Sequence, residues 1–110
     1  MSQAEEIQVA MDDAKHHVNT REALLRLESN PDFQTIVAQA YFKDEAARLV
    51  MARSNPALNE QQRDAVLMMI DGIGSFASFL NEVHRRGMEM EAALKDHETA
   101  LEEVHAEELS

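Results

Sequence analysis

The fold is decided by residues 66–104, which read VLMMIDGIGSFASFLNEVHRRGMEMEAALKDHETALEEV. Apolar side chains, with one glycine and one histidine among them, recur along this stretch in alternating steps of three and four residues. This heptad pattern is typical of a coiled-coil helix that packs along one face against a partner. We call the following positions the heptad seam: Val66, Met69, Ile73, Phe76, Leu80, Val83, Gly87, Met90, Leu94, His97, Leu101 and Val104.

A single helix from residue 60 to the C-terminus would be about 70 Å long, because each residue adds about 1.5 Å. A globule of 110 residues is much narrower than that. We therefore expect part of this helix to project. Residues 60–87 carry further apolar side chains beside the seam, such as Ile70, Ala77 and Phe79, and are expected to join a helical core. Residues 88–110 are expected to form a helical extension.

The charge of the chain is strongly acidic and unevenly distributed. Ten Lys and Arg residues stand against 21 Asp and Glu residues, which gives a formal net charge of −11. Residues 88–110 contain eight acidic residues and one basic residue. An acidic surface opposes direct binding of nucleic acid, which depends on cationic side chains that displace counterions. The acidic extension is either a solvated helix face or a surface for a basic partner.

The N-terminal region carries a helix-start signal. Residues 2–5 read SQAE, a capping-box pattern in which the serine and the glutamate satisfy exposed backbone amides. A helical segment is therefore predicted within residues 1–28. Thr20 would allow a second short helix to begin, or the first helix would run on to about Glu28; the pattern does not choose between these alternatives.

Two Asn-Pro pairs, at residues 30–31 and 55–56, also predict helix starts, because Asn caps free amides and Pro suits the first helical position. Residues 31–53 have an apolar stripe broad enough to face two neighbours, which predicts the core helix. After a short loop, the capping-box pattern NEQQ at residues 59–62 predicts the start of the long helix.

These signals predict an all-α fold of three to four helices, with a compact helical core and a long C-terminal heptad-patterned helix. The organisation is a single helical domain over residues 1–110, divided into segments 1–28, 31–53, 60–87 and 88–110. Three Gly and two Pro are too few for the turns of an all-β fold, and the absence of Cys excludes disulfides and thiolate chemistry. We expect no membrane span, because no apolar run approaches the length of about 18 residues that a span needs.

Glycines inside the long helix need a reason, because each costs about 1 kcal/mol relative to alanine. Gly72 and Gly74 either break the helix or permit a close backbone approach, and we favour the close approach. A phosphate-binding loop would need a preceding strand, which the pattern does not provide. Gly87 follows two arginines and is interpreted as a hinge or helix end between the core and the acidic extension.

The chain offers little for catalysis. Its five His have only carboxylates at helical spacing; Glu102 and His105 form a single Glu-x-x-His, whereas di-iron bundles need two such pairs with further carboxylates. No serine lies in a nucleophile elbow. We predict no enzyme, no catalytic residue, no cofactor, no metal and no small-molecule substrate. The candidate site is a protein interface formed by Val83, Met90, Leu94, His97, Leu101 and Val104.

Four short stretches carry a family resemblance: NPDFQ (30–34), AYFKDEAARLV (40–50), DGIG (71–74) and FASFLNEV (76–83). In these stretches the chain resembles small acidic helical proteins of tailed bacteriophages, whose genes lie in structural or head-assembly clusters. The resemblance spans roughly residues 20–108. It implies a virion structural or assembly protein that forms a homo-oligomer or binds a larger capsid, portal or ejection protein, located in the virion or the host cytoplasm.

An alternative hypothesis follows from the charge. An acidic helix can inhibit a basic host enzyme or imitate the phosphates of DNA. Such an inhibitor would bind less tightly as salt increases, whereas an assembly protein would associate through its apolar seam.

Overall fold

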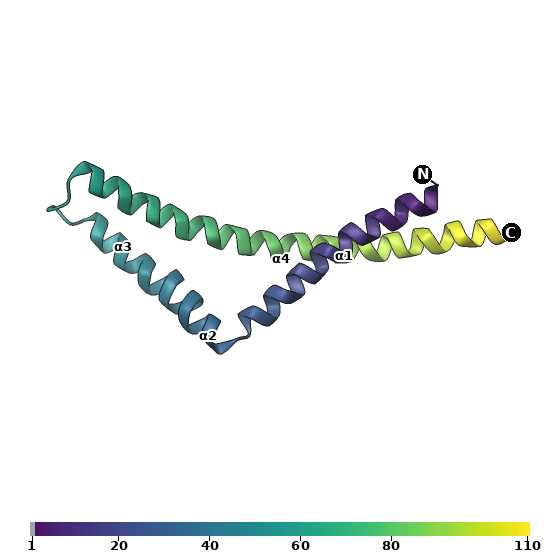
Figure 1. The fold of residues 1–110 in the computed structure, drawn as a ribbon, viewed down its shortest axis with the longest axis horizontal. Helices are drawn as coiled ribbons and strands as arrows, with labels where there is room; N and C mark the ends of the chain where they lie inside the picture. Colours follow the sequence, from purple (N-terminus) through teal and green to yellow (C-terminus); the bar gives the residue numbers. More distant parts are fainter. Residues whose placement is uncertain (1) are drawn as a thin grey trace. The chain divides into compact units, whose positions relative to one another are not determined.

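The computed structural model describes residues 2–110, and every regular element in this range is helical (Figure 1). The predicted all-α fold and the long C-terminal helix are confirmed. The chain forms two compact units: unit 1 joins the described residues up to Leu25 with Glu82–Ser110, and unit 2 is Arg26–Asn81. The elements are α1 (Gln3–Glu28), α2 (Pro31–Phe33), η1 (Gln34–Glu45), α3 (Ala46–Arg53) and α4 (Glu60–Leu109).

Side-chain caps fix the starts of the two longest helices. The hydroxyl of Ser2 accepts a hydrogen bond from the Glu5 amide at 3.1 Å, so α1 begins where the sequence predicts. At the start of α4, the Gln62 amide donates to the Asn59 side chain at 2.8 Å, and the Asn59 amide donates to the Gln62 side chain at 2.9 Å. This reciprocal pair is a complete capping box and confirms the predicted start of the long helix.

The structure decides the open question about α1. The helix runs without interruption to Glu28, so there is no second short helix. Thr20 does not cap a helix start; its hydroxyl donates to the carbonyl of His16 at 2.9 Å, within the helix. The predicted start at Pro31 is confirmed, because the Asn30 side chain accepts a hydrogen bond from the second residue of α2.

The predicted helix start at residues 55–56 is wrong. The Asn55 side chain accepts a hydrogen bond from the Ala57 amide at 2.9 Å, and the chain continues through a turn before α4 begins at Glu60. An asparagine side chain that closes a turn of this kind offers the backbone an alternative to a helix.

Residues 31–53 are helical as predicted, but the sequence did not indicate that the middle segment, η1, is a π-helix. Gln39 donates to Asp44 at 2.9 Å, five residues further on, which is the spacing of a π turn. Because a π turn holds more residues than an α turn, adjacent side chains point in more similar directions around the helix axis. Tyr41 and Phe42 consequently both contact Phe76 of α4, with ring centroids 6.1 and 5.6 Å apart.

Unit 2 is a helical hairpin made by α2, η1 and α3 on one side and residues 60–81 of α4 on the other. Among its residues, only Leu49 and Ile73 are buried. The apolar stripe of residues 31–53 is broad enough for two neighbours, and the hairpin supplies one. Much of that stripe therefore stays accessible.

Unit 1 pairs α1 with the C-terminal part of α4. The start of α1 and the end of α4 lie at the same end of this unit, so its two helices run antiparallel (Figure 1). Met11, Ala14 and Leu24 are buried on α1, and Gly87 and Val104 are buried on α4. The expectation that residues 88–110 project as an extension is wrong, because α1 packs against their apolar side. Helix α1 can do so because it has its own apolar stripe, at steps of three to four residues.

Gly87 is neither a hinge nor a helix end, because α4 continues through it. A Cβ atom at this position would lie 2.4 Å from the Cβ and 2.7 Å from the Cδ of Arg21. The Arg21 stem is pressed so closely onto α4 that its Nε atom is buried without a hydrogen-bond partner. Gly87 is therefore the residue that lets the two helices of unit 1 touch.

Gly72 and Gly74 do not interrupt α4 either. A Cβ atom at either position would have no neighbouring atom within 4 Å. The favoured interpretation, a close approach of another backbone, is therefore wrong within the described chain.

The two kinds of glycine predict opposite effects of alanine. Gly87→Ala should lower the free energy of unfolding, because overpacking costs about 1–3 kcal/mol and outweighs the gain in helix propensity. Gly74→Ala, the control, should raise it by about 1 kcal/mol, because the methyl group meets nothing. Urea unfolding followed by circular dichroism measures both, and an equal gain for the two variants would contradict the close contact at Gly87.

Candidate interaction surface

The six predicted interface residues all lie on α4 within unit 1. Val104 is buried, and the other five, Val83, Met90, Leu94, His97 and Leu101, are half-buried. Helix α1 of the same chain thus gives this part of the heptad seam a partner, which the sequence interpretation did not foresee. Contact of these residues with a second chain stays a prediction.

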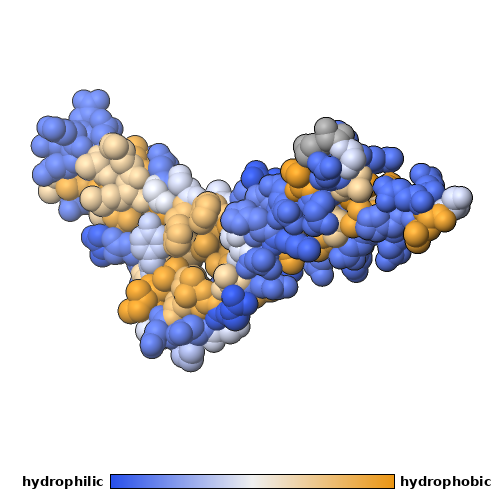
Figure 2. Space-filling model, turned by 45° about the vertical axis from the view of Figure 1, so that its right-hand side comes forward, coloured by the Kyte–Doolittle hydropathy of each residue, from blue (hydrophilic) through white to orange (hydrophobic). Residues whose placement is uncertain are grey.

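Exposed apolar side chains are concentrated on unit 2 instead. Figure 2 shows hydrophobic surface over unit 2 and a mostly hydrophilic surface over unit 1. A gathering of this kind on a protein surface is typical of an interaction site. The large exposed apolar residues of unit 2 are Leu27, Ile36, Val50, Met51, Met68, Met69, Phe76 and Phe79.

Half of these residues lie along one face of α4. Met68 is 74% exposed, Met69 55%, Phe79 59% and Phe76 37%. A second heptad line lies beside the heptad seam, because successive positions are separated by steps of four and three residues. These positions are 65, 69, 72, 76 and 79. We call this surface the α4 stripe, consisting of Ala65, Met68, Met69, Gly72, Phe76 and Phe79.

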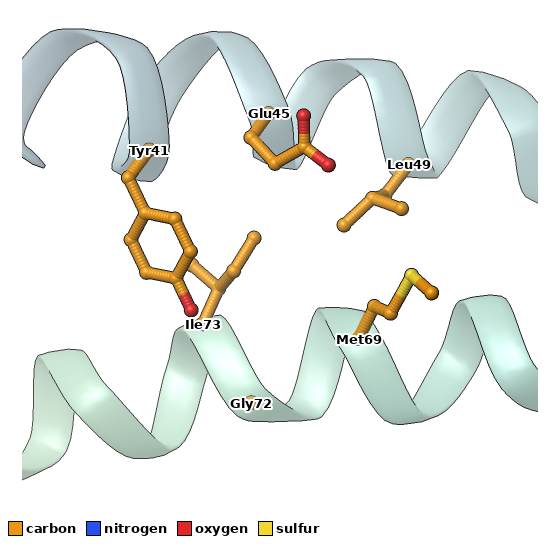
Figure 3. A pocket seen from close by; sticks show the side chains of 6 residues that line it. All are labelled: Tyr41, Glu45, Leu49, Met69, Gly72 and Ile73. Carbon is orange, nitrogen blue, oxygen red and sulfur yellow. The ribbon is translucent and has the colours of Figure 1, made fainter. Parts of the chain in front are cut away.

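An open pocket of about 250 Å³ lies beside the α4 stripe, between the helices of unit 2 (Figure 3). Figure 3 shows Leu49 opposite Met69 and Tyr41 close to Ile73, with Gly72, which has no side chain, between Met69 and Ile73 along α4. Pockets for small molecules usually measure about 300–1,000 Å³. This smaller apolar pocket suits an inserted side chain better than a substrate.

One ion pair borders this pocket. The Nε atom of Arg48 donates to a carboxylate oxygen of Glu45 at 3.0 Å, three residues apart on the helix. The hydrogen bond from Arg48 lowers the pKa of Glu45 and keeps the carboxylate ionised. The pair is neutral in sum, so the rim of the pocket does not select a charged ligand.

A second group of charges lies on α4 in unit 1. Arg85 binds the carboxylates of Glu82 and Glu89, and the Arg86 guanidinium lies 3.4 Å from Glu82. The hydrogen bond from Arg85 lowers the pKa of Glu82. These arginines are engaged by acids of their own helix, which stabilises α4 rather than forming a site for an anionic ligand.

One histidine–carboxylate pair lies on α1. His17 lies 3.9 Å from Asp13, a single pair one helical turn apart. Within residues 2–110, no three His, Cys, Asp or Glu side chains lie close enough together to hold a metal ion.

One helix has the length and apolar composition of a membrane span. Among the described helices, α4 is long and apolar enough, by length and composition alone, to cross a membrane. By this criterion α4 is a candidate, and the prediction of no membrane span stays a prediction. Its apolar side chains lie on one side, however, while Asp64, Asp71, Ser75 and Ser78 occupy the other at helical spacing. A helix with one polar face packs against protein more readily than it spans lipid.

A comparison of the chain with protein-family models, curated proteins and solved structures finds no match.

The packing of α1 on the seam predicts the effect of a charge there. Leu94→Asp should lower the free energy of unfolding by roughly 1–3 kcal/mol, because it removes a half-buried apolar side chain and places a charge against α1. Met88→Asp makes the same charge change at an exposed position of α4 and should stay within about 0.5 kcal/mol. Equal losses in urea unfolding would show that α1 does not cover Leu94.

The Arg85 contact predicts a pH effect. Because the folded-state pKa of Glu82 is lowered, its contribution to stability is present above the unfolded-state pKa and is lost as pH falls through the folded-state pKa. In a carboxyl-detected NMR titration, Arg85→Gln should move the Glu82 pKa back up toward its ordinary value. An unchanged Glu82 titration in this variant would disprove the assignment.

Proposed function

We propose that the protein is a non-enzymatic structural or assembly component that acts by helix-mediated self-association. The observation that carries this proposal is the exposed α4 stripe on a unit with only two buried side chains among its residues. The sequence resemblance supports a bacteriophage virion as the setting, with a larger capsid, portal or ejection protein as a further partner.

A two-helix hairpin can bury only a small part of its apolar surface. A domain of about 60 residues is marginally stable even when its core is well packed. Unit 2 has 56 residues and leaves eight large apolar side chains exposed. Two hairpins placed together would form a four-helix arrangement, the usual solution for helices of this length. A second copy is therefore the simplest source of the missing helices.

The acidic inhibitor is the second candidate function, and one observation favours it. Residues 88–110 carry eight acidic residues and one lysine. This charge lies on unit 1, whereas the exposed apolar surface lies mainly on unit 2. The two functions thus depend on different parts of the chain and respond differently to salt, because salt screens charge contacts and leaves apolar burial intact.

Sedimentation velocity over a wide range of protein concentration tests the proposal. We expect the mass to rise from that of the 12.4 kDa chain to at least twice this value, with little change when the salt concentration is raised. A 12.4 kDa species at every concentration that binds a basic nuclease only at low salt would contradict self-association and favour the inhibitor.

A further inference from the structure

We propose that a second copy of this chain docks on the α4 stripe, with the two α4 helices antiparallel about a two-fold axis at Gly72. This inference rests on the proposed function and names the surface through which self-association occurs. It uses only residues of unit 2, whose helices form one compact body.

The α4 stripe is complementary to itself. In an antiparallel pair centred on Gly72, residues at equal sequence distances before and after Gly72 face each other. Met68 then faces the partner's Phe76, and Ala65 faces the partner's Phe79. The small Ala65 thus meets a large residue, and the same surface serves both copies, as in most homodimers.

No contact within its own chain requires a glycine at position 72. It lies in the middle of an α-helix, where glycine is unfavourable, and a Cβ atom there would meet nothing within 4 Å. At the centre of an antiparallel pair, the missing side chain allows the two helix backbones to approach closely. The pocket beside Gly72 would then be covered by apolar side chains of the partner.

Gly74 has the same surroundings in its own chain, since a Cβ atom there also meets nothing. Two residues further along an α-helix correspond to a rotation of about 200°, so Gly74 lies on a different side from Gly72. It provides a matched control for every substitution at Gly72.

The exposed area is sufficient for a specific contact. Taking about 200 Å² for each fully exposed large side chain, the exposed fractions of Met68, Met69, Phe76 and Phe79 correspond to roughly 450 Å² per copy. The pair would bury roughly 900 Å² from these four residues alone, and flanking residues would raise this above the ~1,000 Å² that a specific interface needs.

A second copy explains the stripe better than a lipid bilayer does. Asp64 and Asp71 border the α4 stripe on the same helix, one turn before and one turn after Met68. A bilayer would surround α4 and force both carboxylates into hydrocarbon, whereas a partner helix covers only the apolar side.

The first test compares Gly72→Glu with Gly74→Glu. Both variants add one negative charge and improve helix propensity, and a Cβ atom at either position has no neighbour within 4 Å in its own chain. Sedimentation equilibrium should show the dimer dissociation constant of Gly72→Glu raised at least about tenfold, because two carboxylates would meet at the axis. Gly74→Glu should stay within about threefold of wild type, and circular dichroism should show both variants to be folded.

The second test uses the absence of cysteine from the natural chain. Under mild oxidation, Gly72→Cys should form a covalent dimer, because a disulfide forms when two Cα atoms lie roughly 4.4–6.8 Å apart. Gly74→Cys should remain largely uncrosslinked. Equal crosslinking of the two variants, or none in either, would overturn the axis at Gly72.

The outcomes separate this inference from the proposed function. A wild-type protein that is monomeric at all concentrations overturns both. A wild-type dimer that both glutamate variants leave intact overturns the α4 stripe as the interface and leaves self-association standing. A monomer that partitions into phosphatidylcholine vesicles, and loses this property in Gly72→Glu, overturns the second copy in favour of a membrane.

Discussion

A helix that has one neighbour can bury one stripe of side chains, and the rest of its surface stays accessible whatever its sequence. Both units of this chain are built from two helices, so this limit governs each of them. Where a helix carries a single narrow seam, one neighbour is enough. Where it carries a second apolar line, some of its apolar surface remains uncovered.

In unit 1 the single neighbouring helix covers the heptad seam, whereas in unit 2 a second apolar line stays exposed. The seam residues of α4 in unit 1 meet the apolar stripe of α1, and Gly87 brings the helices together over the stem of Arg21. In unit 2 the hairpin buries Leu49 and Ile73 but leaves the α4 stripe exposed, with Gly72 among large apolar side chains. The proposed function accordingly involves the unit whose packing is incomplete, because exposed apolar surface is the feature that a partner would remove from water.

The sequence was informative where structure depends on neighbouring residues. The caps at Ser2 and Asn59 and the start at Pro31 follow from side chains that bind amides two or three residues away, and all three are confirmed. It failed at Asn55, where two local hydrogen-bonding patterns compete. The π-helix was missed because it brings Tyr41 and Phe42 onto Phe76, a contact between residues over thirty positions apart.

The predicted interface also depends on a contact between residues that are distant in the sequence. Periodicity showed that the seam from Val83 to Val104 needs a partner, but it could not show that α1, at the other end of the chain, supplies one. The α4 stripe shares Met69 and Phe76 with the heptad seam. The other residues distinguish the two lines, because Ile73 of the seam is buried whereas Met68 and Phe79 of the stripe are exposed.

The central claim is that unit 2 completes its core with a second copy, and the most direct measurement is the thermal unfolding midpoint as a function of protein concentration. If folding and association are coupled, the midpoint rises steadily as the protein is concentrated, because association stabilises only the folded chain. A midpoint that stays constant over a hundredfold range of concentration would contradict the account.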